Sequence, residues 1–503
     1  MEGLPMRQRR FWPVALLMTL SLLVSACGAQ EAASKPQPTA TSTPKITLQP
    51  TLTGVVDRAS IVVKANMVLG DAVPAYFTGF SIEASSLCEF LSAEQKNSAI
   101  DRLYHNFAPL IIRIGGNTME TSVWKPNAPC SGVTFGNSTI QAVFAFAHRV
   151  DAKIIWGLNL SADNPSAAAD EASVVVADGG SALAGLEIGN EPNDWTTESQ
   201  YEASWQAYVA AIKRRTGFDG FVGPSMYDYE GQSWFNHTIQ RERDSLSLVT
   251  YHYYPMQYNA TTSPQRPTVN NLLSRALMAQ TAVDLKRVVT VAHANGLSLV
   301  IDETNSSNGG GARGVSDSVA SALWMADYLF TAEENGVTAV NVHGGGATSG
   351  PDYAPLKIQG RNGSLIVAPI YYGMYLFHMA TGDGATTPIG AAVASSANIT
   401  AHAVRDRNGV IQLALINKDT SANVDAEVRL QGVSKRYHVT QVTRLAGPSL
   451  WSTAGVTLDG LPFAPNGSWR APMTTENIPM SGSSLTISVP KTSAILVTLA
   501  PNP

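Results

Sequence analysis

Dense clusters of lysine and arginine are absent from the 503-residue chain beyond its first ten residues, and the formal net charge is −5. This mild acidity argues against nucleic acid or another polyanion as the main partner. Internal repeats with the periods of solenoids or propellers are absent as well. With 44% hydrophobic and 15% charged residues, the composition is that of a globular protein with one large domain and a smaller one.

Cysteine is scarce, and the first of three, Cys27, ends a distinctive N-terminal segment, residues 1–27. Three arginines precede the apolar "FWPVALLMTLSLLVSAC", the pattern of a secretory signal. Its "VSAC" resembles a bacterial lipobox, in which Cys27 becomes the lipidated first residue; a plain signal peptide with an incidental cysteine is the alternative. Residues 28–53, rich in Pro, Thr and Ser, are expected to be a flexible tether. These features predict an exported cell-surface lipoprotein anchored to a bacterial membrane.

Short apolar segments then alternate with helix-like stretches, a pattern typical of parallel strands joined by crossover helices. Residues 317–336, for example, follow the helical period. The eight strand-like segments predict a (β/α)₈ TIM barrel over residues 75–380. They are residues 74–83, 109–117, 153–160, 185–191, 220–225, 246–254, 297–304 and 338–346. The fifth segment is the weakest strand prediction, since "GFVGPS" holds two glycines and a proline. Without this strand, the pattern would instead indicate a doubly wound sheet.

Beyond the barrel the pattern changes to alternating strands separated by Gly, Asn and Pro turns. Residues 381–503 are therefore predicted to form a small antiparallel β-sandwich. The segment 54–74, which precedes the barrel, is expected to supply one or more strands to it. The two other cysteines, Cys88 and Cys130, follow the first two barrel strands, so we expect a disulfide between their neighbouring loops.

Functional groups of a (β/α)₈ barrel lie at the C-terminal ends of its strands. Two carboxylates stand there, Glu191 after the fourth strand and Glu303 in the seventh, on opposite sides of the barrel mouth. Cleavage of a glycosidic bond needs such a pair, one to protonate the leaving oxygen and one to attack the sugar or activate water. Alone, Glu191 could instead mark a helix start, because Asn190 and Pro192 suit that role.

Other polar groups at the strand ends have simpler interpretations. Arg113 is expected to be an ion-pair partner of the catalytic carboxylates rather than a substrate contact. His252 and His343 lack neighbours at metal-ligand spacing, so we predict no metal, and no organic cofactor is needed.

The segments "GLEIGNEPN" and "DETNSSNGGGARGVSDSVASALWMADYL" resemble the acid/base and nucleophile segments of the heparanase and β-glucuronidase family, glycoside hydrolase family 79 of clan A. "FTGFSIE", "LIIRIGGNT", "VTYHYYP" and the C-terminal "LTISVPKTSAILVTL" add to this resemblance, which covers the chain from about residue 54 to its end. It implies a retaining hydrolase in which Glu303 is the nucleophile and Glu191 the acid/base.

The resemblance also implies a set of substrate contacts. Asn190 corresponds to the position that contacts the sugar 2-hydroxyl, and Glu83 to an acid that binds sugar hydroxyls. Backbone N–H groups of the glycine loop and a tyrosine phenol would hold a uronic acid carboxylate. The implied substrate-binding residues are Glu83, Asn117, Asn190, Tyr254, Gly309, Gly310 and Tyr353. One departure concerns Asn308, since relatives commonly carry a tyrosine before the glycine loop.

The expected activity is therefore that of an exo-acting β-glucuronidase on carbohydrate that bears terminal β-glucuronic acid. Endo-cleavage of a sulfated chain is less favoured, because few lysines or arginines cluster near the strand ends. Two alternatives stay open: a retaining glycosidase for a neutral sugar, of arabinofuranosidase or glucanase type, and a non-catalytic carbohydrate-binding lipoprotein.

Overall fold

The computed structural model describes residues 45–47, 53–227, 233–346, 350–359, 364–382, 384–472 and 474–503. The predicted signal segment, Cys27 and nearly all of the predicted tether lie outside these residues. None of the helices in the described residues is both long enough and apolar enough to cross a membrane.

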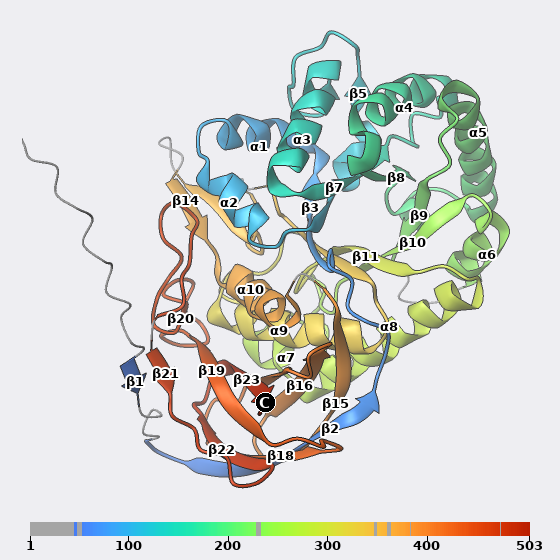
Figure 1. Ribbon diagram of the computed structural model, residues 1–503. Helices are drawn as coiled ribbons and strands as arrows, with labels where there is room; N and C mark the ends of the chain where they lie inside the picture. Colours follow the sequence, from blue (N-terminus) through green and yellow to red (C-terminus); the bar gives the residue numbers. More distant parts are fainter. Residues whose placement is uncertain are drawn as a thin grey trace, which may run out of the picture. The chain divides into compact units, whose positions relative to one another are not determined.

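Eight parallel strands close into a barrel, as the apolar segments predicted (Figure 1). Each strand pairs with its sequence neighbours, and the last, β12, returns to pair with the first, β3. The barrel strands are β3 (Thr78–Glu83), β4 (Leu110–Gly115), β7 (Ala152–Leu158), β8 (Leu183–Ile188), β9 (Phe221–Met226), β10 (Leu246–Tyr253), β11 (Leu299–Thr304) and β12 (Ala339–His343). The uncertain fifth segment is β9, which pairs with β8 and β10, so the doubly wound alternative is wrong.

Helices connect the strands and cover the outside of the barrel. Thr197 illustrates how they begin, because its hydroxyl accepts a hydrogen bond from the Gln200 N–H and caps α5. The helices are α1 (Leu87–Glu94), α2 (Ala99–His105), α3 (Asn137–Val150), α4 (Pro165–Gly179), α5 (Glu198–Thr216), α6 (Ser233–Glu242), α7 (Val269–Leu272), α8 (Arg275–Ala294), α9 (Val319–Glu334) and α10 (Pro369–Thr381). Shorter 3₁₀ turns are η1 (Ala84–Ser86), η2 (Asn117–Thr121), η3 (Gly180–Ala182) and η4 (Pro192–Asp194).

The barrel interior changes from apolar to charged along its axis. Ile111 and Val300 belong to a small apolar cluster inside the barrel. Arg113 and Asp302 follow two residues later on the same strands, so they face the same side nearer the C-terminal end. The strand order therefore delivers charged side chains to the barrel mouth above an apolar layer.

The C-terminal domain differs in one respect from the predicted antiparallel β-sandwich. Its main strands form one nine-stranded mixed sheet, in which β2, from the segment before the barrel, pairs parallel with β18 and antiparallel with β15. In Figure 1 the blue β2 lies beside orange and red strands. Apolar side chains from both halves of this sheet share one core, which explains why the strand pattern resembled that of a sandwich.

The strands of the sheet, in spatial order, are β20 (Thr457–Leu458), β19 (Tyr437–Ala446), β23 (Ser493–Pro501), β17 (Ile411–Asn417), β16 (Ile399–Asp406), β15 (Thr386–Ala394), β2 (Val56–Val68), β18 (Asn423–Gln431) and β22 (Ser484–Val489). Three two-stranded pairs complete the structure: β1 (Lys45–Thr47) with β21 (Thr474–Glu476), β5 (Val123–Trp124) with β6 (Thr134–Phe135), and β13 (Leu356–Gln359) with β14 (Ser364–Val367).

Helix α9 joins the barrel to this sheet. All of its residues except the last are buried, including a few polar ones among many apolar ones. At its centre Asp327 accepts a hydrogen bond from the Thr400 hydroxyl of β16 at 2.8 Å and pairs with Lys418 and His402. A buried ion cluster therefore ties the helix that follows the predicted nucleophile to the C-terminal sheet.

Candidate active site

A cavity of about 330 Å³ opens at the C-terminal ends of the barrel strands. The residues that line it come from loops after most of the strands and include every predicted catalytic or substrate-binding residue except Asn190. They are Glu83, Asn117, Glu191, Asp194, Tyr227, Tyr254, Tyr258, Glu303, Asn308, Gly309, Gly310, His343 and Tyr353.

The two predicted catalytic carboxylates lie close together. One oxygen of Glu191 and one of Glu303 are within 4.8 Å of each other and of a ring nitrogen of His252. Retaining glycosidases hold their carboxyl groups about 5–5.5 Å apart, whereas inverting enzymes need about 6.5–9.5 Å to admit a water molecule. The separation suits the retaining arrangement.

Glu303 is held as an anion. Its Oε1 accepts a hydrogen bond from the Tyr254 hydroxyl at 2.8 Å, and its Oε2 accepts one from Arg113 at 2.7 Å. Burial acts to raise the pKa of Glu303, but the nearby His343, His252 and Arg113 outweigh it and lower this pKa to about 2. Glu303 is therefore a carboxylate at neutral pH, with both oxygens oriented by donors.

Glu191 shows the opposite shift. Burial and the charge of Glu303 raise its pKa above the usual value, although a 2.9 Å hydrogen bond with His252 Nδ1 acts to lower it. Its backbone is left-handed, with φ of 44°, and its N–H donates to the Ser225 carbonyl. A left-handed glutamate is uncommon and costs conformational energy, so this turn is what directs the side chain into the cavity.

Arg113 organises the charges beneath the cavity. Besides Glu303, it donates to both oxygens of Glu187, to the Asn190 side-chain oxygen at 2.7 Å, and lies 3.3 Å from Asp302. Burial raises the pKa of Glu187 to about 8, against the opposing effect of Arg113. The expected role of Arg113 as an ion-pair partner agrees with this geometry.

Glu83 lies at the end of β3 and lines another side of the cavity. Its carboxylate accepts bonds from the Thr118 N–H at 2.7 Å and lies 3.3 Å from His343 Nε2. Burial acts to raise its pKa, but the bond and charge of His343 leave the pKa of Glu83 lowered. A Cβ on Gly116, where φ is 85°, would lie 2.3 Å from Glu83 Oε2, so only glycine leaves room for this carboxylate.

Asn190 lies at the edge of this arrangement rather than in the lining of the cavity. Its side-chain oxygen accepts from Arg113, and its amide donates to Asn117 Oδ1 at 2.8 Å. Its backbone N–H donates to Glu120 Oε1 at 2.6 Å, and burial raises the pKa of Glu120 to about 7. Asn190 therefore holds the cavity residue Asn117 in place and links it to Arg113.

The loop after β11 brings Asn308 and three glycines to the cavity. Gly309, Gly310 and Gly311 have φ of 64°, 87° and 85°, a backbone available mainly to glycine. The Asn308 side chain accepts from the Tyr258 N–H at 2.9 Å, and a Cβ on Gly309 would lie 2.3 Å from the Tyr258 ring. Asn308 thus holds a tyrosine from the loop after β10 against the glycine loop.

Glu191, His252 and Glu303 could also bring three ligand atoms to a metal ion. Both carboxylates already have protein partners, because Tyr254 and Arg113 each donate to one oxygen of Glu303 and His252 bonds Glu191. We assign no metal to this group.

The loops after β3 and β4 are joined by a disulfide at one side of the mouth. Cys88 and Cys130 are bonded, with their Cα atoms 5.4 Å apart.

Comparison with known proteins connects this site to a family. Residues 401–496 match the model of the glycosyl hydrolase family 79 C-terminal beta domain. A β-glucuronidase of Aspergillus niger is 25% identical over 374 residues, which are 63% of this chain and 66% of the relative's length. The C-terminal domain therefore belongs to glycoside hydrolase family 79, and the β-glucuronidase relative supports the same family for the rest of the chain.

Solved structures of other glycosidases share the fold of this hydrolase. A 4-O-α-L-rhamnosyl-β-D-glucuronidase of Fusarium oxysporum has a TM-score of 0.72 at 19% identity, over 91% of this chain and 100% of the other. A family 51 arabinofuranosidase of Xanthomonas axonopodis has a TM-score of 0.65 at 15% identity, over 88% and 100% of the two chains. The barrel and its associated sheet thus occur together in other glycosidases.

Several residues of the site were not assigned a role from the sequence. His252 was considered at a strand end only as a metal ligand, and Glu187, Asp194, Tyr227 and Tyr258 were not singled out at all. Their partners lie tens of residues away along the chain, as with His252 and Glu191, which are 61 residues apart. Glu187 and His252 could have been found as inward-facing polar residues on β8 and β10, whereas Asp194, Tyr227 and Tyr258 lie outside the barrel strands.

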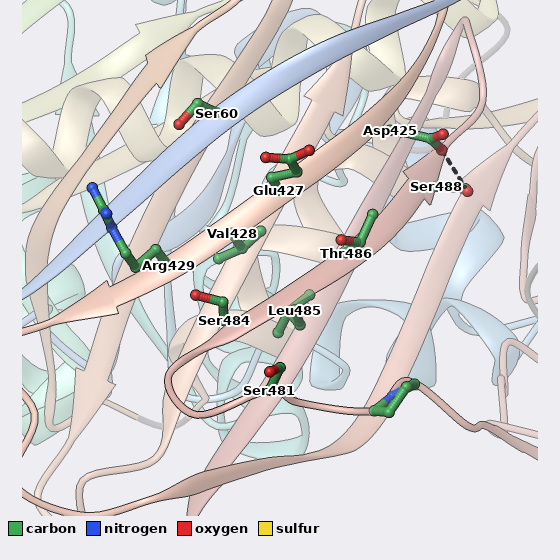
Figure 2. Close-up of a pocket in the computed structure, with 11 residues that line it drawn as sticks. Ser60, Asp425, Glu427, Val428, Arg429, Ser481, Ser484, Leu485, Thr486 and Ser488 are labelled. Carbon is green, nitrogen blue, oxygen red and sulfur yellow. Dashed lines mark hydrogen bonds between the residues drawn. The ribbon is translucent and has the colours of Figure 1, made fainter.

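A second cavity, of about 660 Å³, lies on the C-terminal sheet of the hydrolase (Figure 2). It is lined by side chains of β18 and β22, and the Ser488 hydroxyl donates to Asp425 at 2.9 Å. None of its described lining residues is aromatic or histidine. The smaller cavity at the barrel mouth, which holds the carboxylate pair, is therefore the candidate active site.

Proposed function

We propose that this family 79 hydrolase is a retaining, exo-acting β-glucuronidase that removes terminal β-linked glucuronic acid from glycans or glycoconjugates. The observation that carries the proposal is the carboxylate pair, with oxygens within 4.8 Å and opposite pKa shifts. One group is ready to attack and the other to donate a proton, as a double-displacement reaction requires.

In the first step an oxygen of Glu303 attacks the anomeric carbon, and the bond from that carbon to the leaving oxygen breaks. Glu191 gives its proton to the leaving oxygen. The product is a glycosyl ester on Glu303 and an anionic Glu191. In the second step Glu191 takes a proton from water, the water oxygen bonds to the anomeric carbon, and the ester bond breaks to regenerate Glu303 and release glucuronic acid.

Recognition of the uronic acid carboxylate is assigned to the glycine loop and Tyr353. Among the described residues, no acceptor is found for the backbone N–H groups of Gly309 and Gly310, which line the cavity. Successive N–H groups in such a left-handed turn form a concave anion site. The relatives support this assignment, since both are named as acting on β-glucuronides.

Exo action is supported by the size of the cavity. At about 330 Å³ it is near the lower limit of ligand sites, which span about 300–1,000 Å³. Such a cavity suits one terminal sugar with a small part of its leaving group better than an extended chain.

Hydrolysis of an aryl β-glucuronide by wild type, Glu191→Ala and Glu303→Ala tests the proposal. We expect wild type to release the phenol, and both variants to lose at least about 10²-fold in kcat. Glu191→Ala should slow the hydrolysis of substrates with poor leaving groups most, because these groups most need to be protonated as they leave. Equal rates in the three proteins would contradict the mechanism.

A neutral-sugar glycosidase is the alternative that the family 51 fold match favours. Aryl α-arabinofuranosides and β-glucosides run in the same assay separate the two, since turnover of these alone would contradict uronate specificity. A protein that binds glycosides with no turnover, equally well in Glu303→Gln, would be a carbohydrate-binding lipoprotein.

We further propose that the chain is exported and held at the cell surface by a lipid on Cys27. The supporting feature is the apolar segment that ends in "VSAC" and the Pro- and Thr-rich stretch after it. In bacterial cells, the full-length protein should partition into a detergent phase, and Cys27→Ser should move it to the aqueous phase. Equal partitioning of both would contradict lipidation.

A further inference from the structure

The leaving-group side of the cavity can be located from the chemistry of Glu191. Because Glu191 protonates the leaving oxygen, the group attached to that oxygen lies beside it. Asp194 and Tyr227 line the cavity and adjoin Glu191. Asp194 ends the turn η4, with its N–H bonded to the Glu191 carbonyl at 3.0 Å, and Tyr227 follows β9 directly.

These two side chains are fixed to each other. The Tyr227 hydroxyl donates to Asp194 Oδ1, and the Asn193 side chain donates to the Tyr227 carbonyl. No donor within the described residues reaches the other carboxylate oxygen of Asp194. An oriented acceptor therefore remains where a leaving group would pass.

Charged groups are also distributed unevenly around the cavity. Its described lining includes the carboxylates of Glu83, Asp194 and Glu303 and the acid Glu191, but no lysine or arginine. The histidine of the lining, His343, lies against Glu83 and Glu303 rather than Asp194. Backbone N–H groups able to bind an anion are found in the glycine loop that follows β11, whereas the acid/base side carries Asp194. An anionic sugar is thus accommodated at one end, while a second anion at the other end would meet a carboxylate.

We propose that Asp194, held by Tyr227, selects the leaving group: it accepts a hydrogen bond from a neutral, hydroxyl-bearing leaving group and repels an anionic one. This rests on the proposed function and specifies its substrate class. Natural substrates would then carry glucuronic acid on a neutral sugar or alcohol rather than on a sulfated or uronate-bearing residue. The effect is electrostatic, and because Asp194 is exposed, it should be weakened by salt.

The test compares two aryl β-glucuronides whose phenols carry a para-sulfonamide, which is neutral, or a para-sulfonate, which is anionic. Wild type should favour the neutral substrate in kcat/KM by about five-fold or more at low salt, beyond the difference expected from leaving-group acidity. Asp194→Asn should remove most of this preference by raising kcat/KM for the sulfonate, and Asp194→Glu should restore it. Added salt at 0.5 M should reduce the preference in wild type but not in Asp194→Asn.

Asp244→Asn is the matched control, because Asp244 is 92% exposed and does not line the cavity. It should leave the preference unchanged. Hydrolysis of both substrates with the same ratio in wild type and Asp194→Asn would overturn the inference and leave the proposed function intact. If wild type hydrolysed neither substrate, the result would contradict both this inference and the proposed function.

Discussion

Glu191 and Glu303 are the same residue type in the same cavity, and both are buried, yet their pKa values shift in opposite directions. Burial disfavours the charged form of each. Glu303 overcomes this through three nearby positive groups and two hydrogen-bond donors, whereas Glu191 has the single hydrogen bond from His252 and a carboxylate neighbour. Neighbouring charge, rather than burial, therefore divides the roles.

The pH dependence of kcat/KM should follow from these shifts. Glu303 must be ionised and Glu191 protonated, so activity should fall in acid as Glu303 takes up a proton and in alkali as Glu191 loses one. The positive charge of His252 lowers both pKa values. In His252→Gln both limbs of the pH profile should therefore move to higher pH. Unchanged limbs would show that His252 is neutral and does not influence the pKa values of the two glutamates.

Tyr254→Phe removes one donor from Glu303 and leaves the ring in place. A hydrogen bond to a charged group contributes about 1.5–3 kcal/mol, so kcat should fall by about 10- to 100-fold. The acid limb of the profile should move up, because the anion of Glu303 is less stabilised. Tyr253→Phe is the control, since the Tyr253 hydroxyl contacts Thr281 and Asp284 instead; an equal loss there would contradict the assignment.

At the scale of elements, β11 shows how a strand can bring two acidic residues to one site. Side chains alternate along a regular strand, so Asp302 and Glu303 should face opposite sides. The pairing register of β11 shifts after Ile301 against β12, and that of β10 shifts before His252. Such irregularities redirect side chains next to active sites, which allows both Asp302 and Glu303 to contact Arg113.

Helix α9 follows the glycine loop and depends on a buried charge pair. Asp327 is fully buried and its pKa is well below the usual range, because Lys418 and His402 outweigh the effect of burial. Lys418→Met would remove one of the two cations that pair with this carboxylate. It should therefore lower the free energy of unfolding by about 3–5 kcal/mol. Urea denaturation measures this, with the exposed Lys435→Met as the control that should change little.

At the scale of the whole molecule, two regions of chain beside the active site are tied by a covalent link. The disulfide of Cys88 and Cys130 closes a loop of 42 residues around β4. Because it restricts the unfolded chain, its loss should lower the free energy of unfolding by about 2–4 kcal/mol. Cys130→Ser and the double variant with Cys88→Ser should be equally destabilised in urea; a much larger effect of the second substitution would argue against the bond.

The strands of the barrel and the positions of its two catalytic candidates were predictable because both depend on local sequence. A buried strand needs a run of apolar residues, and the barrel fold places the residue after that run at the mouth. Strand β15 carries little local signal for a strand, since "TTPIGAAVA" has a proline, a glycine and several alanines. Its place in the sheet depends on pairing with β2 and β16.

The sequence by itself determined the order of the strands, their apolar interiors and the acidic residues at their ends, because these follow from the periodicity of neighbouring residues. Tertiary structure alone determined the ionisation states of the two catalytic glutamates. Glu303 is kept ionised by His343, His252 and Arg113, the last of which lies 190 residues earlier in the chain, and Glu191 bonds a histidine 61 residues later. A pKa depends on the groups around a side chain in space, and no local pattern specifies which distant residues the barrel brings there.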